Sequence, residues 1–202
     1  MNVSTRYIFL LALCASLLAS CQQIPIFSPA TTTPEIDPEV EEYAVYNALL
    51  EHRFSSGSTN QVLIMDHTRV NNPDLLERDL ASFQENFPVE LGLIDNFKDR
   101  NQQPHPLEPT LEISLEYQLL SQGEVDELRP QDEASGWKLF YELYPETVGF
   151  LYLSRVGFSS DFNQALVYLE WYHYDQPIQG GYYLFTRQDG GWEFETGYQW
   201  ET

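Results

Sequence analysis

The sequence predicts an α+β domain in which N-terminal helices pack on an antiparallel sheet that includes a C-terminal four-strand meander. In the first half of the chain, apolar residues recur at the three- and four-residue spacing of amphipathic helices. The last third contains four runs rich in β-branched and aromatic residues, separated by short turns. With 202 residues, of which 43% are hydrophobic, the chain suffices for one domain with a packed core.

Residues 1–20 are predicted to be a bacterial lipoprotein signal peptide. One basic residue, Arg6, precedes an apolar run from Tyr7 to Ala19, which is shorter than the roughly 20 residues of a membrane span. The stretch Leu18-Ala19-Ser20-Cys21 resembles a lipobox, the pattern at which the signal is cut and the new N-terminal cysteine is diacylated. Lipidation of Cys21 is therefore expected. The alternative is an ordinary secretory signal that happens to contain a cysteine.

This prediction accounts for both cysteines of the chain, since Cys14 leaves with the signal and Cys21 carries the lipid. The folded domain then has no thiol for a disulfide, a zinc site or a cysteine nucleophile. A two-acyl anchor holds firmly, whereas anionic head groups repel an acidic chain, so the lipid makes the attachment. The predicted location is the bacterial cell envelope, anchored on the outside of the cytoplasmic membrane, with the outer membrane and the periplasmic face both left open.

Residues 21–37 combine the lipidated cysteine with a Pro/Thr-rich tether, and residues 38–202 are expected to form one globular domain. Asp37 followed by Pro38 is typical of an N-cap with proline at the first helical position. A helix is therefore expected from Pro38 to Arg53. Its expected apolar face consists of Val40, Tyr43, Tyr46 and Leu50.

Further elements are expected between this helix and the meander. A second cap-plus-proline pair, Asn72-Pro73, begins a helix that ends before Pro88. The other expected elements are a buried strand at 62–65, a short helix at 93–98, a strand at 111–120, and short helices at 122–128 and 136–143.

The meander is expected to consist of the runs 148–158, 164–174, 181–187 and 192–200. Its third run is apolar on both sides, which is typical of a central strand with both faces covered. In the last run, aromatic and polar residues alternate, which predicts a strand with one buried and one solvent-exposed face. The residues expected to share the buried face are Trp192, Phe194, Thr196, Tyr198 and Trp200.

Four segments of this region carry a resemblance to known proteins. They are Ser154-Arg155-Val156-Gly157-Phe158, Gln164-Ala165-Leu166-Val167-Tyr168, Tyr182-Tyr183-Leu184 and Asp189-Gly190-Gly191-Trp192. Together they resemble the C-terminal signature of an uncharacterised family of bacterial secreted proteins and predicted lipoproteins. The resemblance implies an exported α+β domain and transfers no catalytic residue.

Charge and residue spacing exclude several function classes. Ten Lys and Arg against 31 Asp and Glu give a net charge of −21, which opposes nucleic-acid binding. The four histidines are scattered, and the chain has no HExxH motif, no GxSxG motif and no acidic calcium loop. No cofactor, metal site or catalytic residue is predicted.

Polar groups at two predicted strand positions are candidate binding residues. Asp66 and His67 end the buried strand at 62–65, where polar groups often face a cleft; a strand end that reaches solvent is the simpler interpretation. Glu170 lies mid-strand among aromatic residues, where burial would suit an acid catalyst. Arg155 lies on the neighbouring run, and a cross-strand ion pair with Glu170 is the structural interpretation.

Aromatic residues concentrate in the meander, and Trp171 and Tyr182 are the candidates for stacking on sugar rings beside Glu170. Core packing is the simpler interpretation, because aromatic residues are favoured in strands. The leading functional prediction is a non-enzymatic binding or interaction module, attached to the membrane through its lipid and serving a glycan, cell-wall or envelope-protein partner. The alternatives are a carbohydrate-active hydrolase with paired carboxylates and a purely structural envelope role.

Overall fold

The computed structural model describes residues 36–55, 61–70, 73–128, 133–173 and 177–201. A compact unit spans Ile36–Thr202. The predicted signal peptide at 1–20, the lipidation residue Cys21 and the tether up to residue 35 lie outside the described residues.

Five helices of the described residues lie where the sequence predicts them. They are α2 (Pro38–Phe54), α3 (Pro73–Asn86), α4 (Leu93–Arg100), α5 (Gln122–Glu127) and α6 (Glu133–Leu143). Asp37 caps α2, since its side chain accepts a hydrogen bond from the backbone N–H of Glu39 at 2.9 Å. The expectation that Val40 joins the buried face of α2 is wrong, because this side chain is 65% exposed. The buried face begins at Glu42 instead.

The described strands form one sheet in the order β2-β1-β3-β5-β6-β7, with β4 paired to β5 beside this path. The strands are β1 (Gln61–Met65), β2 (Glu116–Leu120), β3 (Thr147–Leu153), β4 (Gly157–Phe158), β5 (Gln164–Tyr172), β6 (Gln179–Gln188) and β7 (Gly191–Glu201). The strand expected at 111–120 is therefore confined to β2. The first run of the meander is split into β3 and β4.

The α+β class is confirmed, and β5, β6 and β7 form an antiparallel meander. The other side of the sheet differs from the expectation, because β1 runs parallel to both β2 and β3. The sheet as a whole is mixed. The reason lies in the connections, since two helices separate β1 from β2 and two more separate β2 from β3. Such long crossovers allow parallel pairing.

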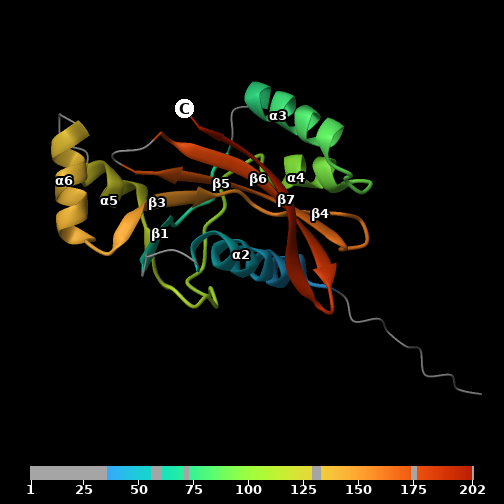
Figure 1. Cartoon of the computed structure of the whole chain (residues 1–202), viewed down its shortest axis with the longest axis horizontal. Coiled ribbons are helices and arrows are strands. Elements are labelled where there is room, and N and C mark those ends of the chain that lie inside the picture. The colour runs from blue at the N-terminus through green and yellow to red at the C-terminus, as the bar shows by residue number, and fades with distance from the viewer. Residues whose placement is uncertain (1–35, 56–60, 71–72, 129–132, 174–176, 202) are drawn as a thin grey trace, which may run out of the picture. The chain divides into compact units, whose positions relative to one another are not determined.

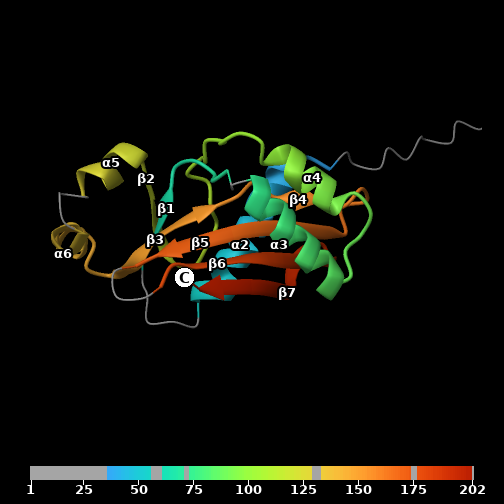
Figure 2. The same ribbon diagram turned by 90° about the horizontal axis from the view of Figure 1, so that it is seen from above.

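Helices cover both faces of the sheet. Figure 1 shows α2 on one face and α3 with α4 on the other, and Figure 2 shows α5 and α6 at the opposite end from α3 and α4. The core clusters follow this layering. Val62 and Ile64 of β1 pack in the cluster of α2, while Leu63 and Met65 pack in the cluster of α5 and α6.

Strand β6 lies inside the sheet, between β5 and β7, and both of its faces are covered, as its sequence predicts. Tyr183 and Phe185 lie in the cluster of α2, and Tyr182 and Leu184 lie in the cluster of α3 and α4. Each face of the strand is therefore covered by a helix layer.

Strand β7 departs from the predicted single buried face. Its pairing with β6 shifts by one residue, because Leu184 lies opposite Thr196 while Phe185 lies opposite Phe194. This β-bulge reverses the alternation. Trp192 packs in the cluster of α2 and Trp200 against the cluster of α3 and α4. The expectation that all alternate residues share one face is wrong for this reason.

The chain leaves the sheet between β3 and β4 and returns against α4. A Cβ atom at Gly157 would lie 2.5 Å from the Cα of Phe97, so the backbones of β4 and α4 touch at a position where only glycine fits. This close approach brings the C-terminal end of α4 over residues 154–156.

Candidate functional site

A buried carboxylate, Glu42, lies where α2, α4 and the link between β3 and β4 meet. It is 1% exposed. Its Oε1 accepts a hydrogen bond from the backbone N–H of Val156 at 2.8 Å and lies 3.0 Å from the hydroxyl of Tyr46. Its Oε2 accepts hydrogen bonds from Nη2 of Arg100 and Nη2 of Arg155, each at 2.7 Å. One buried negative charge therefore faces two guanidinium groups.

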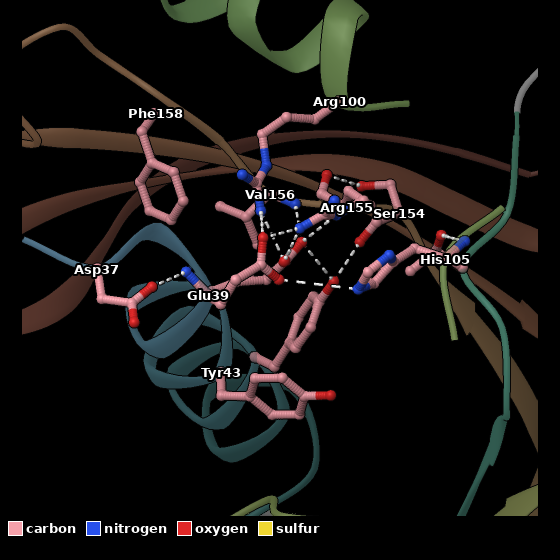
Figure 3. A network of polar contacts seen from close by, with 12 residues as sticks. Asp37, Glu39, Tyr43, Arg100, His105, Ser154, Arg155, Val156 and Phe158 are labelled. Atoms are coloured by element: carbon pink, nitrogen blue, oxygen red, sulfur yellow. Dashed lines mark hydrogen bonds and ion pairs between the residues drawn. The ribbon is translucent and has the colours of Figure 1, made fainter. Parts of the chain in front are cut away.

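A second carboxylate, Glu39, lies on the first turn of α2 with its side chain 52% exposed. Its Oε1 lies 2.5 Å from Nη2 of Arg155 and 3.4 Å from Nη2 of Arg100, and its Oε2 lies 3.7 Å from Nε2 of His105 (Figure 3). Burial raises the pKa of Glu39, but the hydrogen bond and charge of Arg155, with the charges of Arg100 and His105, outweigh burial and hold this pKa below its ordinary value. We call Glu39, Glu42, Arg100, His105 and Arg155 the arginine network.

The side chain of Asn101 joins the C-terminal end of α4 to the backbone of Arg155. Arg100 is the last residue of α4, and the buried Asn101 follows it. The Asn101 amide donates to the carbonyl oxygens of Phe97 at 2.8 Å and Arg155 at 2.9 Å, and its Oδ1 accepts from the N–H of Arg155 at 2.8 Å. Burial lowers the pKa of Arg155, but the hydrogen bonds and charges of Glu42 and Glu39 outweigh burial and raise it. Arg155 is therefore a fixed, permanent charge.

Within the described residues, two cavities adjoin the arginine network. The first, the His105 cavity, has a volume of about 320 Å³ and is lined by Asp99, Arg100, Gln102, Gln103, Pro104, His105 and Arg155. The second, the Phe158 cavity, has a volume of about 310 Å³ and is lined by Pro38, Gly92, Asn96, Asp99, Arg100, Phe158, Ser159, Ser160 and Phe162. Asp99 and Arg100 line both, so the cavities are neighbours at the C-terminal end of α4.

The two cavities differ in chemistry. Carboxylate, amide, guanidinium and imidazole groups line the His105 cavity. The Phe158 cavity adds two aromatic rings, Phe158 and Phe162, which stack with centroids 5.0 Å apart. Phe162 has a φ angle of 57°, which bulky residues seldom adopt, so the turn after β4 holds this ring in a strained backbone conformation.

Arg155 belongs to the arginine network, but Glu170 does not, and the predicted Arg155–Glu170 ion pair is wrong. Glu170 Oε2 lies 2.7 Å from Nη1 of Arg69, and the residue opposite Glu170 on β3 is Tyr152. Arg155 lies in the link that leaves the sheet after β3, so it has no strand partner and turns toward α2.

Glu170 is 5% exposed and is buried beside the tyrosine side chains Tyr168 and Tyr172. The hydroxyl of Tyr172 donates to Glu170 Oε1 at 3.0 Å, and Arg69 donates to that hydroxyl at 2.7 Å. Burial raises the pKa of Glu170, and the charge of Arg69 with the hydrogen bonds of Tyr172 and Tyr168 offsets this only in part. The contacts of Glu170 with Arg69 and Tyr172 match the structural interpretation of a buried ion pair, with Arg69 in place of Arg155.

Asp66 and His67 lie directly after β1, and both side chains reach solvent. Nδ1 of His67 lies 2.8 Å from Oδ1 of Asp66, with side-chain exposures of 56% and 33%. His67 also forms an isolated β-bridge with Pro106. Neither residue lines the His105 cavity or the Phe158 cavity.

Tyr182, the other aromatic candidate, is 1% exposed, and its ring packs against α3 and α4. Trp171 is half-buried on the opposite face, where it lies edge-on to Phe54 at 5.3 Å and stacks on His173 at 4.4 Å. The two rings therefore cannot stack on one sugar. Core packing explains both.

Sequence reasoning missed four residues of the arginine network, Glu39, Glu42, Arg100 and His105. Glu42 precedes the buried residues Tyr46 and Leu49 at helical spacing, and an acid on the apolar stripe of a helix indicates a buried ion pair. No comparable local pattern marks Arg100 or His105, since they meet Glu42 and Glu39 only through tertiary packing.

Comparisons with known proteins return no match. No family model matches the chain, and the searches of the curated proteins and of the solved structures found no match. The resemblance of the C-terminal segments to secreted proteins and lipoproteins therefore stays a prediction. Among the described residues, no helix has the length and apolar character needed to cross a bilayer. The same part of the chain holds no group of three or more His, Cys, Asp or Glu side chains arranged for a metal ion.

Proposed function

We propose that this chain is a lipid-anchored protein of the bacterial cell envelope whose globular domain at 38–202 is a non-enzymatic module that binds glycan or cell-wall ligands. The export signal, the lipobox-like stretch before Cys21 and the Pro/Thr-rich tether support the anchor. The observation that carries the binding function is the pair of neighbouring cavities at the end of α4.

The lining of the two cavities suits sugars. Planar amide, carboxylate and guanidinium groups offer paired donors and acceptors for neighbouring hydroxyls, and Asp99, Gln102, Gln103 and Arg100 supply them. The ring of Phe162 supplies apolar contact for a sugar face. Beside the cavities, Arg100 and Arg155 form ion pairs with Glu42. Charged groups held in this way suit the binding and orientation of a ligand, which fits a binding module.

Substitution of the predicted lipidation residue tests the anchor. In cells fed radiolabelled palmitate, the wild type is expected to carry label and to sediment with membranes, whereas Cys21→Ala carries no label and leaves the membrane fraction. Cys14→Ala is the matched control, since this residue lies within the predicted signal, and it should behave as the wild type does. Equal labelling of Cys21→Ala and wild type would contradict the anchor.

Thermal unfolding of the full chain in mild detergent tests the binding function. A glycan or cell-wall fragment at about 100 times its Kd adds about 2.7 kcal/mol, a rise in Tm of several degrees. Gln103→Ala, in the His105 cavity, is expected to reduce this rise, and Gln199→Ala, on β7, should not. Identical behaviour of the two variants would place the ligand elsewhere. No rise with any fragment would contradict glycan binding.

A further inference from the structure

We propose that the His105 cavity recognises the carboxylate of an acidic sugar, and that the carboxylate of Glu39 is an internal stand-in which this ligand displaces from Arg155 and Arg100. The inference rests on the glycan-binding function proposed above. It names the ligand class as a uronic-acid glycan.

The charge balance of the arginine network identifies the group that a ligand can replace. Glu42 holds both arginines with a single carboxylate, so the buried part of the network carries one more positive than negative charge. Glu39 supplies the missing negative charge. The side chain of Glu42 is 2% exposed and that of Glu39 is 52% exposed. A solvent-borne anion can therefore exchange with Glu39 while Glu42 stays in place.

Glu39 uses only one of its two carboxylate oxygens to contact the arginines. It reaches both arginines through Oε1 alone, at 2.5 Å to Arg155 and 3.4 Å to Arg100. Guanidinium groups bind carboxylates best through two parallel hydrogen bonds, which Glu39 does not form here. In addition, Nε of Arg100 is buried and has no hydrogen-bond partner among the described residues. Exchange of one carboxylate for another leaves the net charge of the site unchanged.

The remaining lining of the cavity selects a hydroxylated acid over a bare anion. Asp99 lines the cavity, and its oxygens accept hydrogen bonds from hydroxyls. Gln102 and Gln103 donate and accept beside it. A uronic acid combines one carboxylate with several hydroxyls on each ring, which matches this set. Inorganic phosphate does not.

The experiment is isothermal titration of the full chain in non-ionic detergent with hexagalacturonate and with its fully methyl-esterified form. These two probes differ only in their carboxylates. The wild type is expected to bind the acid at least about tenfold more tightly than the ester, and Glu39→Gln to bind the acid at least about tenfold more tightly than the wild type does.

Two further variants separate the proposal from simpler effects. Glu142→Gln removes the same charge on α6, which Figures 1 and 2 show at the opposite end of the sheet from α4, and it should bind as the wild type does. Arg155→Lys keeps the charge beside Glu42 but loses the planar fork, and it is expected to weaken binding of the acid, with its fold checked by circular dichroism.

Each other outcome overturns the inference. Equal binding of acid and ester, or equal effects of Glu39→Gln and Glu142→Gln, would mean that Glu39 is no stand-in, while glycan binding would survive. Binding of neutral glycans without any binding of the acid would have the same meaning. Failure of every glycan to bind would remove the proposed function together with the inference.

Discussion

Replacement of Glu42 by glutamine is expected to destabilise the domain strongly, because the buried carboxylate is the central acceptor of the arginine network. It accepts hydrogen bonds from Arg100, from Arg155 and from the backbone of Val156. Loss of one partner from a buried ion pair costs about 3–5 kcal/mol. For a domain of this size, each kcal/mol lowers Tm by about 2–4 °C, so Tm should fall by about 6–20 °C.

The assay is thermal unfolding of the full chain in mild detergent, followed by circular dichroism at neutral pH. Glu39→Gln is the matched control, since it makes the same chemical change one helical turn away at a half-exposed position. This control should cost no more than about 1 kcal/mol. If Glu42→Gln also costs less than about 1 kcal/mol, the argument that Glu42 is the fixed part of the network is refuted.

Two further substitutions test other parts of the fold. Burial raises the pKa of Glu170, so the domain loses stability as pH rises and this buried group ionises. Arg69→Met removes the positive charge that partly offsets burial, and the pKa of Glu170 should rise further. The loss in the free energy of unfolding is therefore expected to be larger at about pH 7 than at about pH 4. Urea unfolding at both pH values measures this, and equal losses would contradict it. Gly157→Ala should cost about 1–3 kcal/mol because its Cβ meets the backbone of Phe97, whereas Gly191→Ala, whose Cβ meets no atom closer than 3.9 Å, should change stability by less than about 0.5 kcal/mol. Thermal unfolding of both variants measures this, and equal values would contradict the close approach of α4 and β4.

Local patterns predicted the elements of the fold well. Asp37 with Pro38 correctly places the start of α2, and the apolar residues of β6 correctly indicate a strand covered on both faces. Local patterns do not reveal a one-residue bulge. Glu195 is the extra residue of β7, and the bulge there turns Trp192 and Trp200 to opposite faces although their spacing in the sequence suggests one face.

The candidate site was predicted only in part, for a physical reason. Arg155 was selected from the sequence, but its partners were not, because pairing across strands requires a register that the sequence leaves open. The chain leaves the sheet after β3, and Arg155 reaches α2 instead of β5. Trp171 and Tyr182 were selected for their ring chemistry, and tertiary packing places both rings against the core.

The most direct measurement of the central claim is a crystal structure of the chain with trigalacturonate. A ligand carboxylate is expected against Arg155 and Arg100 in the His105 cavity, with Glu39 turned to solvent and Glu42 still holding both arginines. A structure in which Glu39 keeps its contact with Arg155, and the sugar lies elsewhere, would contradict the account.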